Sequence, residues 1–265
     1  MRSKLSNLGL KAVAWDGAGL ANAVGVEALS WAPLLAFAAE SEASTEPAYV
    51  HVKKLLVHVT REDDTGAGNF ENRRVLATEI LTWLDGWILE ERNHSVFFQV
   101  AAACASAGAG GLEVAAVRHS VVYPIPSDQP LERTLIFLLF SEVASMVAYR
   151  AWAKEVRSGA LKRALLKIQK DEAMHYLVFL GFVKRLCSLD PRLVREVRLV
   201  RISFARSLRW QSEKGKDLRP GDAQEINWWN HEVFQNACGP SAILDNILRF
   251  QADTQARIFR ALEAA

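Results

Sequence analysis

Cysteine is scarce in this chain of 265 residues, which contains only three. Cys104, Cys187 and Cys238 form no CxxC pair, so neither a structural zinc site nor a disulfide framework is expected. Free thiols are typical of reducing compartments. We therefore expect a cytoplasmic protein.

An excess of one charge sign is also missing. The 32 Lys and Arg residues nearly balance the 30 Asp and Glu residues, for a formal net charge of +2. Domains that bind nucleic acid usually carry a clear basic excess. No nucleic-acid partner is expected.

Long uncharged hydrophobic runs are absent as well. No apolar run reaches the roughly 18 residues of a membrane-spanning helix, so no membrane span is expected. Lys11 and Asp16 interrupt the first apolar stretch, which makes it a poor signal peptide. The longest apolar run, 135–149, carries Glu142 near its middle.

Helical periodicity is what the sequence does have, with only eight prolines, most of them between periodic segments. It predicts an all-α fold of long antiparallel helices in one domain, 1–265, with a bundle core over about 26–190 and further helices over about 191–265. The helices are predicted at 26–46 (continuing or restarting at Pro47, to 61), 71–107, 112–123, 131–157, 160–189 and 191–210, with the last helical stretches between 223 and 264.

Glu142 is an acid in an apolar setting. On a helix its neighbours three and four positions away are Leu138, Leu139, Ser145 and Met146. An unpaired buried carboxylate is costly, so this one is expected to be neutral, ion-paired or bound to a metal.

Two Glu-x-x-His motifs lie on apolar helix faces on either side of Glu142. Glu91 and His94 form the first motif, and Glu172 and His175 form the second. Residues three apart share a helix face, so a carboxylate and an imidazole can hold one ion. Carboxylates with one imidazole per metal suit iron or manganese rather than structural zinc.

A di-iron carboxylate bundle takes a Glu-x-x-His from each of two helices and a lone Glu from each of the other two. Three of those contributions are present, so the fourth has to be a Glu that precedes Glu91. Glu40, Glu42 and Glu46 are the candidates, and Glu42 and Glu46 share a face because they are four apart.

The segment from about Trp83 to Pro191 resembles the soluble acyl-acyl-carrier-protein desaturases, which are ferritin-like di-iron enzymes. Trp83 and Trp87 followed by Glu90-Glu91-Arg92-Asn93-His94, the lone-Glu segment 140–145, and Asp171-Glu172-Ala173-Met174-His175 are each similar to a family motif. Upstream, Thr45-Glu46 and the turn at 64–66 lie at nearly the family's spacing, which favours Glu46 as the fourth ligand. The family's proline lies four residues after that Glu, whereas Pro47 lies five after Glu42, so Glu42 stays an alternative.

The resemblance implies a ferritin-like four-helix bundle that holds two iron ions and uses O₂ to desaturate an acyl chain on an acyl carrier protein. It implies bridging roles for Glu91 and Glu172, one iron each for His94 and His175, and terminal roles for Glu46 and Glu142. It further implies a hydrogen bond or proton from Ser145 near the O₂ site, and electron transfer through Trp87 and Asp171. A ferredoxin-type electron donor and a homodimer are implied in the same way.

Two features modify this interpretation. The family usually has Arg just before each His, where this chain has Asn93 and Met174, so a hydroxylation or other oxidation of a carrier-bound acyl or aminoacyl group is an alternative outcome. Between residues 192 and 219, nine Lys and Arg face three acids, and Arg195, Arg198 and Arg201 among them are candidates for docking an acidic carrier protein. A ferritin-like iron-storage protein and a metal-free scaffold are the alternatives from other classes.

Overall fold

The computed structural model describes residues 31–61, 70–107, 128–157, 159–200 and 260. It confirms the predicted all-α fold, because no strand occurs in these ranges. The helices are α2 (Ala32–Ala43), α3 (Thr45–Arg61), α4 (Phe70–Ala107), α5 (Leu131–Glu155) and α6 (Gly159–Leu189), and residues 193–200 are also helical. The helices predicted at 112–123 and beyond 200 lie outside the described residues.

The first predicted helix is divided at Ser44. The amide and the hydroxyl of Ser44 both donate to the carbonyl of Ser41, at 3.1 and 2.6 Å, and the Thr45 hydroxyl donates to the carbonyl of Glu42 at 2.5 Å. These bonds satisfy carbonyls at the end of α2. Pro47 lies in the first turn of α3, where its missing N–H costs nothing. The helix is therefore interrupted just after Glu42.

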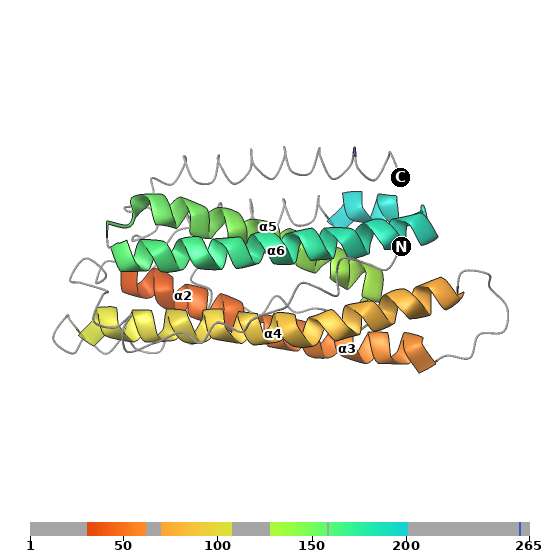
Figure 1. Cartoon of the computed structure of the whole chain (residues 1–265), viewed down its shortest axis with the longest axis horizontal. Coiled ribbons are helices and arrows are strands. Elements are labelled where there is room, and N and C mark those ends of the chain that lie inside the picture. Colours follow the sequence, from red (N-terminus) through yellow and green to blue (C-terminus); the bar gives the residue numbers. More distant parts are fainter. Residues whose placement is uncertain (1–30, 62–69, 108–127, 158, 201–259, 261–265) are drawn as a thin grey trace, which may run out of the picture.

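The helices form two packed pairs (Figure 1). In one pair, α4 packs against α2 and α3, which follow one another and together make one helical track; in the other, α5 packs against α6. The four helical tracks are therefore α2 with α3, α4, α5 and α6. Side-chain contacts fix their directions, which are antiparallel for α3 with α4 and for α4 with α6, and parallel for α4 with α5. Helices α3 and α4 are joined by Lys53–Asp85 and Glu46–Arg92. Helices α4 and α6 are joined by Glu79–Arg185 and Glu90–His175. Helices α4 and α5 are joined by Arg73–Glu132 and Trp87–Glu142. α4 therefore ends, and α5 begins, at opposite ends of the molecule.

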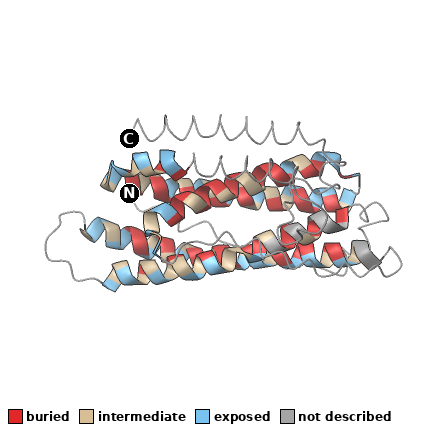
Figure 2. Ribbon diagram, turned by 180° about the vertical axis from the view of Figure 1, so that it is seen from behind, coloured by how far each residue is buried: buried red, intermediate tan, exposed pale blue. Residues whose placement is uncertain are grey.

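The buried residues lie where the two pairs face each other (Figure 2). Large aromatic side chains fill this core, and Trp87, Trp152, Phe98, Phe140 and Phe179 are each less than 2% exposed. Such side chains bury the most apolar surface per residue and so contribute strongly to the stability of the core.

Helix α5 is both long and apolar. Among the described helices, it is the one that is long and apolar enough to cross a membrane by length and composition alone. In the structure, 67% of its most apolar 18-residue window is buried inside the protein. Its face toward α4 carries Glu142, which is 3% exposed as the apolar context of this residue predicts.

Candidate metal centre

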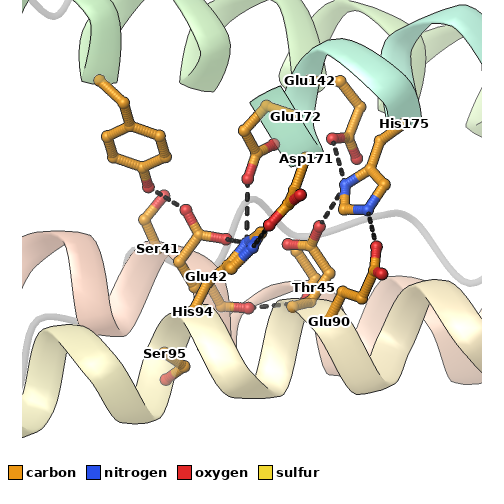
Figure 3. Close-up of polar contacts among 12 residues, drawn as sticks. Ser41, Glu42, Thr45, Glu90, His94, Ser95, Glu142, Asp171, Glu172 and His175 are labelled. Atoms are coloured by element: carbon orange, nitrogen blue, oxygen red, sulfur yellow. Dashed lines mark hydrogen bonds and ion pairs between the residues drawn. The ribbon is translucent and has the colours of Figure 1, made fainter. Parts of the chain in front are cut away.

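Six acidic and imidazole side chains meet in the core where all four helical tracks come together (Figure 3). Helix geometry explains the meeting, because each Glu-x-x-His places its two groups on one inward face. All six residues are at most 3% exposed: Glu42 from α2, Glu91 and His94 from α4, Glu142 from α5, and Glu172 and His175 from α6.

The cluster is two overlapping groups of four, and each group could hold a metal ion. One group is Glu42, Glu91, His94 and Glu172, and the other is Glu91, Glu142, Glu172 and His175. Within each group the candidate ligand atoms lie within 4.8 Å of one another. Glu91 and Glu172 belong to both groups, so these two carboxylates can be shared between two ions.

Both imidazoles point one nitrogen into the cluster. The Nδ1 atom of His94 lies 3.1 Å from Glu172 Oε1 (Figure 3). The Nδ1 atom of His175 lies 2.9 Å from Glu91 Oε1. These pairs are close, but they lack the alignment of hydrogen bonds.

The outward nitrogens are held by carboxylates in a reciprocal arrangement. His94 of α4 has its Nε2 3.5 Å from Asp171 Oδ2 of α6, and His175 of α6 has its Nε2 2.7 Å from Glu90 Oε2 of α4. A carboxylate at Nε2 favours the tautomer that keeps its proton there, which leaves the Nδ1 lone pair for a metal.

Glu42 and Glu142 each belong to one group only, and the carboxylate of each accepts a hydrogen bond from one aromatic side chain. The indole Nε1 of Trp87 donates to Glu142 Oε1 at 3.2 Å, and the phenol of Tyr149 donates to Glu42 Oε1. The second oxygen of each acid faces a histidine, at 3.3 Å for Glu142 Oε2 to His175 Nδ1 and 3.8 Å for Glu42 Oε2 to His94 Nδ1.

Five atoms of the cluster are buried without a hydrogen-bond partner in the described ranges: Glu91 Oε1, His94 Nδ1, Glu142 Oε2, Glu172 Oε1 and His175 Nδ1. Buried polar groups are almost always satisfied, and each one left alone is costly. Metal coordination would satisfy all five at once, so the residues present fit metal ions.

Electrostatics in the metal-free cluster place protons on it. Burial raises the pKa of Glu42 and of Glu172 well above the usual carboxyl value, and neighbouring carboxylates add to the effect. Burial also opposes charging of His94 and His175, but the carboxylates around each ring outweigh it and raise both pKa values. Glu91 departs from its neighbours, because His175 lowers its pKa despite burial.

The structure brings together five of the six predicted ligands, Glu91, His94, Glu142, Glu172 and His175. The preference for Glu46 as the sixth is wrong, and the alternative, Glu42, occupies the place. The side chain of Glu46 is 41% exposed and bonds Arg92 at 2.6 Å. In an unbroken helix Glu42 and Glu46 would share a face, but the break at Ser44 separates them. The side chain of Glu40, the third candidate, is outside the described part of the chain.

Replacing Glu46 with alanine is expected to have little effect. Surface ion pairs such as Glu46–Arg92 typically contribute less than about 1 kcal/mol. Urea unfolding should therefore show a loss below that value, and metal content after loading should be unchanged. Loss of metal from this variant would contradict the placement of Glu46 outside the cluster.

The other predicted residues lie at different distances from the cluster. Trp87 and Asp171 contact it directly, through Glu142 and His94, and Asp171 also pairs with Lys167 at 2.8 Å. Ser145 is half-buried one turn after Glu142, without a hydrogen bond to the six residues in the described structure. Arg195 and Arg198 are exposed on the helical segment 193–200, and Arg201 lies outside the described residues.

Two residues of the site were not predicted. Glu90 could have been found, because it precedes Glu91 as Asp171 precedes Glu172. Tyr149 lies two helical turns after Glu142 and so on the same face of α5. Nothing in the sequence, however, indicates that its phenol reaches Glu42 on another helix.

No family model matches this chain, and comparisons with curated proteins and with solved structures gave no match.

Proposed function

We propose that this chain is a di-iron, O₂-dependent oxidoreductase that desaturates an acyl chain carried on an acyl carrier protein. One observation carries the proposal: two four-residue groups share Glu91 and Glu172 and contain one histidine each. This is the ligand set of ferritin-like di-iron carboxylate proteins, in which two helices give one Glu each and two give Glu-x-x-His.

The donor atoms support iron over structural zinc. The cluster offers four carboxylates and two imidazoles, whereas structural zinc sites are dominated by thiolates and imidazoles in closed tetrahedra. Four ionised carboxylates carry four negative charges, which two divalent cations balance. The directions of the helices support the same class, because parallel α4 and α5 match the single long crossover of ferritin-like bundles.

In this proposal Glu91 and Glu172 would be shared by the two ions, His94 and Glu42 would complete the site of one ion, and His175 and Glu142 would complete the site of the other. Iron held in this way supplies the O₂ chemistry that oxidises an unactivated C–H bond.

The protein around the six ligands orients them and keeps water out. Asp171 and Glu90 orient the two imidazoles. The buried rings of Phe140 and Phe179 belong to the apolar core that excludes bulk water. Trp87 and Asp171 each touch a ligand residue, which supports a role in bringing electrons to the site. Ser145, one turn from Glu142 on α5, keeps its proposed role near the O₂ site.

The substrate and the partners rest on the motif resemblance. Exposed Arg195 and Arg198 suit an acidic carrier protein, since complementary charge speeds encounter. A ferredoxin-type donor, a homodimer and a cytoplasmic location complete the proposal.

Hydroxylation is the second candidate, and one observation favours it. Asn93 and Met174 stand where the desaturases have Arg, and each directly precedes a histidine of the cluster. Groups around the ligands tune a metal site, so this change bears on the reaction outcome.

The test is anaerobic loading with Fe(II), followed by O₂ and a carrier-bound acyl chain. We expect two tightly bound irons per chain, and a product that has lost two hydrogens. A product that has gained one oxygen would replace desaturation with hydroxylation. No tight iron in the wild-type protein would overturn the di-iron assignment, including its storage alternative.

A further inference from the structure

The two ends of the cluster are held by different aromatic donors. Trp87 of α4 donates its indole N–H to Glu142, and Tyr149 of α5 donates its phenol O–H to Glu42. Both donors are buried, at 0% and 3% exposure. Each bond takes one carboxylate oxygen and leaves the other facing a histidine.

The phenol of Tyr149 is fixed in place by its neighbours. Its ring lies 5.2 Å from that of Phe98 at a 34° tilt, and 5.3 Å from that of Trp152 at 69°. A ring packed on two sides keeps its hydroxyl at a defined position, so the bond to Glu42 is preorganised.

Glu42 needs such a tether more than the other ligands do. It lies in the last turn of α2, two residues before the break at Ser44, whereas Glu91, Glu142 and Glu172 lie well inside long helices. Carbonyls near a helix end lack the regular backbone bonds that hold a helix interior. The bond from Tyr149 ties this end of α2 to α5.

We infer that Tyr149 is a positioning residue for the metal ion at the Glu42–His94 position, as Trp87 is at the Glu142–His175 position. The inference rests on the proposed function for the presence of two ions. Tyr149 occupies Glu42 Oε1 and leaves Oε2 as the oxygen offered to the metal. Because a phenol serves one position and an indole the other, the two positions are chemically unequal.

The test compares Tyr149→Phe with Trp87→Phe in the full-length protein. Each change removes a donor and leaves an aromatic ring in the core. Partners that orient metal ligands typically change affinity about 10- to 100-fold when they are lost. In an anaerobic Fe(II) titration we expect Tyr149→Phe to weaken one of the two binding steps by that factor and to leave the other step in place. Trp87→Phe should weaken the opposite step.

Mössbauer spectra of the loaded proteins supply a readout that general destabilisation would not move. Each variant should alter one of two ferrous signals, and the two variants should alter different ones. Tyr49→Phe is the matched control, because the Tyr49 hydroxyl bonds Asp85 and Lys53 on the outer side of α3 and α4. It should leave both signals unchanged.

The outcomes separate the inference from the proposed function. If wild type binds two irons but Tyr149→Phe leaves both steps and both signals intact, the positioning role is wrong. Equal changes at both positions would also overturn it. If wild type binds no iron, the proposed function is wrong whatever the variants show, and the positioning role, which rests on it, is wrong as well.

Discussion

Replacing Glu172 with alanine is expected to remove both metal ions. Glu172 belongs to both four-residue groups, and its Oε1 atom lies 3.1 Å from His94 Nδ1 while remaining without a hydrogen bond. Without this carboxylate each group keeps only three candidate ligand residues, and Glu91 is the one carboxylate still shared by both groups. Iron per chain after anaerobic loading and desalting should fall from about two to about zero.

Glu142→Ala provides the comparison, because Glu142 belongs to one group only. It should lose the ion at the His175 position first, so its iron content should fall to about one or below. Glu46→Ala should retain the wild-type content, since its partner is Arg92 at the surface. A Glu172→Ala protein that folds and still binds two irons would contradict the shared-carboxylate arrangement.

The metal-free protein is expected to lose stability as the pH rises above about 6.5, the usual pKa of histidine. The pKa values of His94 and His175 are raised in the folded protein, so the folded state holds protons that the unfolded state releases above about 6.5. Stability from such groups is present below the unfolded pKa and is lost as pH rises through the folded pKa. The raised pKa values of Glu42 and Glu172 act in the same direction from about 4.5 upward. Glu91, with its lowered pKa, opposes them only over the acidic range.

The metal-loaded protein should behave in the opposite way. Metal ligands must be deprotonated, so binding releases protons and strengthens as pH rises. Thermal unfolding of both forms across this range would measure the effect. If the folded and unfolded states differ by one bound proton, the free energy of unfolding changes by about 1.4 kcal/mol per pH unit. For a chain of this size, each kcal/mol shifts the melting temperature by roughly 2–4 °C. A gap between the two melting temperatures that stays constant with pH would rule out protonation of the cluster.

Most of the candidate metal centre could be predicted because its chemistry is local in sequence. A Glu and a His three residues apart share a helix face wherever the helix lies, and an acid among apolar residues is conspicuous in any sequence. Five ligands and four helical tracks follow from such short-range patterns.

The identity of the sixth candidate ligand depended on a feature that periodicity does not show. Whether Glu42 or Glu46 points inward is decided by where the helix breaks, and the break lies at Ser44 rather than at Pro47. Proline in the first turn of a helix begins it instead of ending it. The bond from Tyr149 to Glu42 joins residues more than 100 positions apart, so only the packed structure reveals it.

The spread of the ligands along the chain has a consequence for how the protein matures. Glu42 and Glu172 are about 130 residues apart, and α6 supplies the carboxylate of Glu172, which belongs to both groups, and the histidine His175. A nascent chain that has not yet completed α6 contains neither full group of ligands, although Glu42, Glu91 and Glu142 have already been synthesised. Long-range contacts of this kind form late, because closing a long loop is entropically costly. If the cluster holds metal ions, metal binding would therefore report completed folding, since each group of four ligands comes from three helices and both groups need α6.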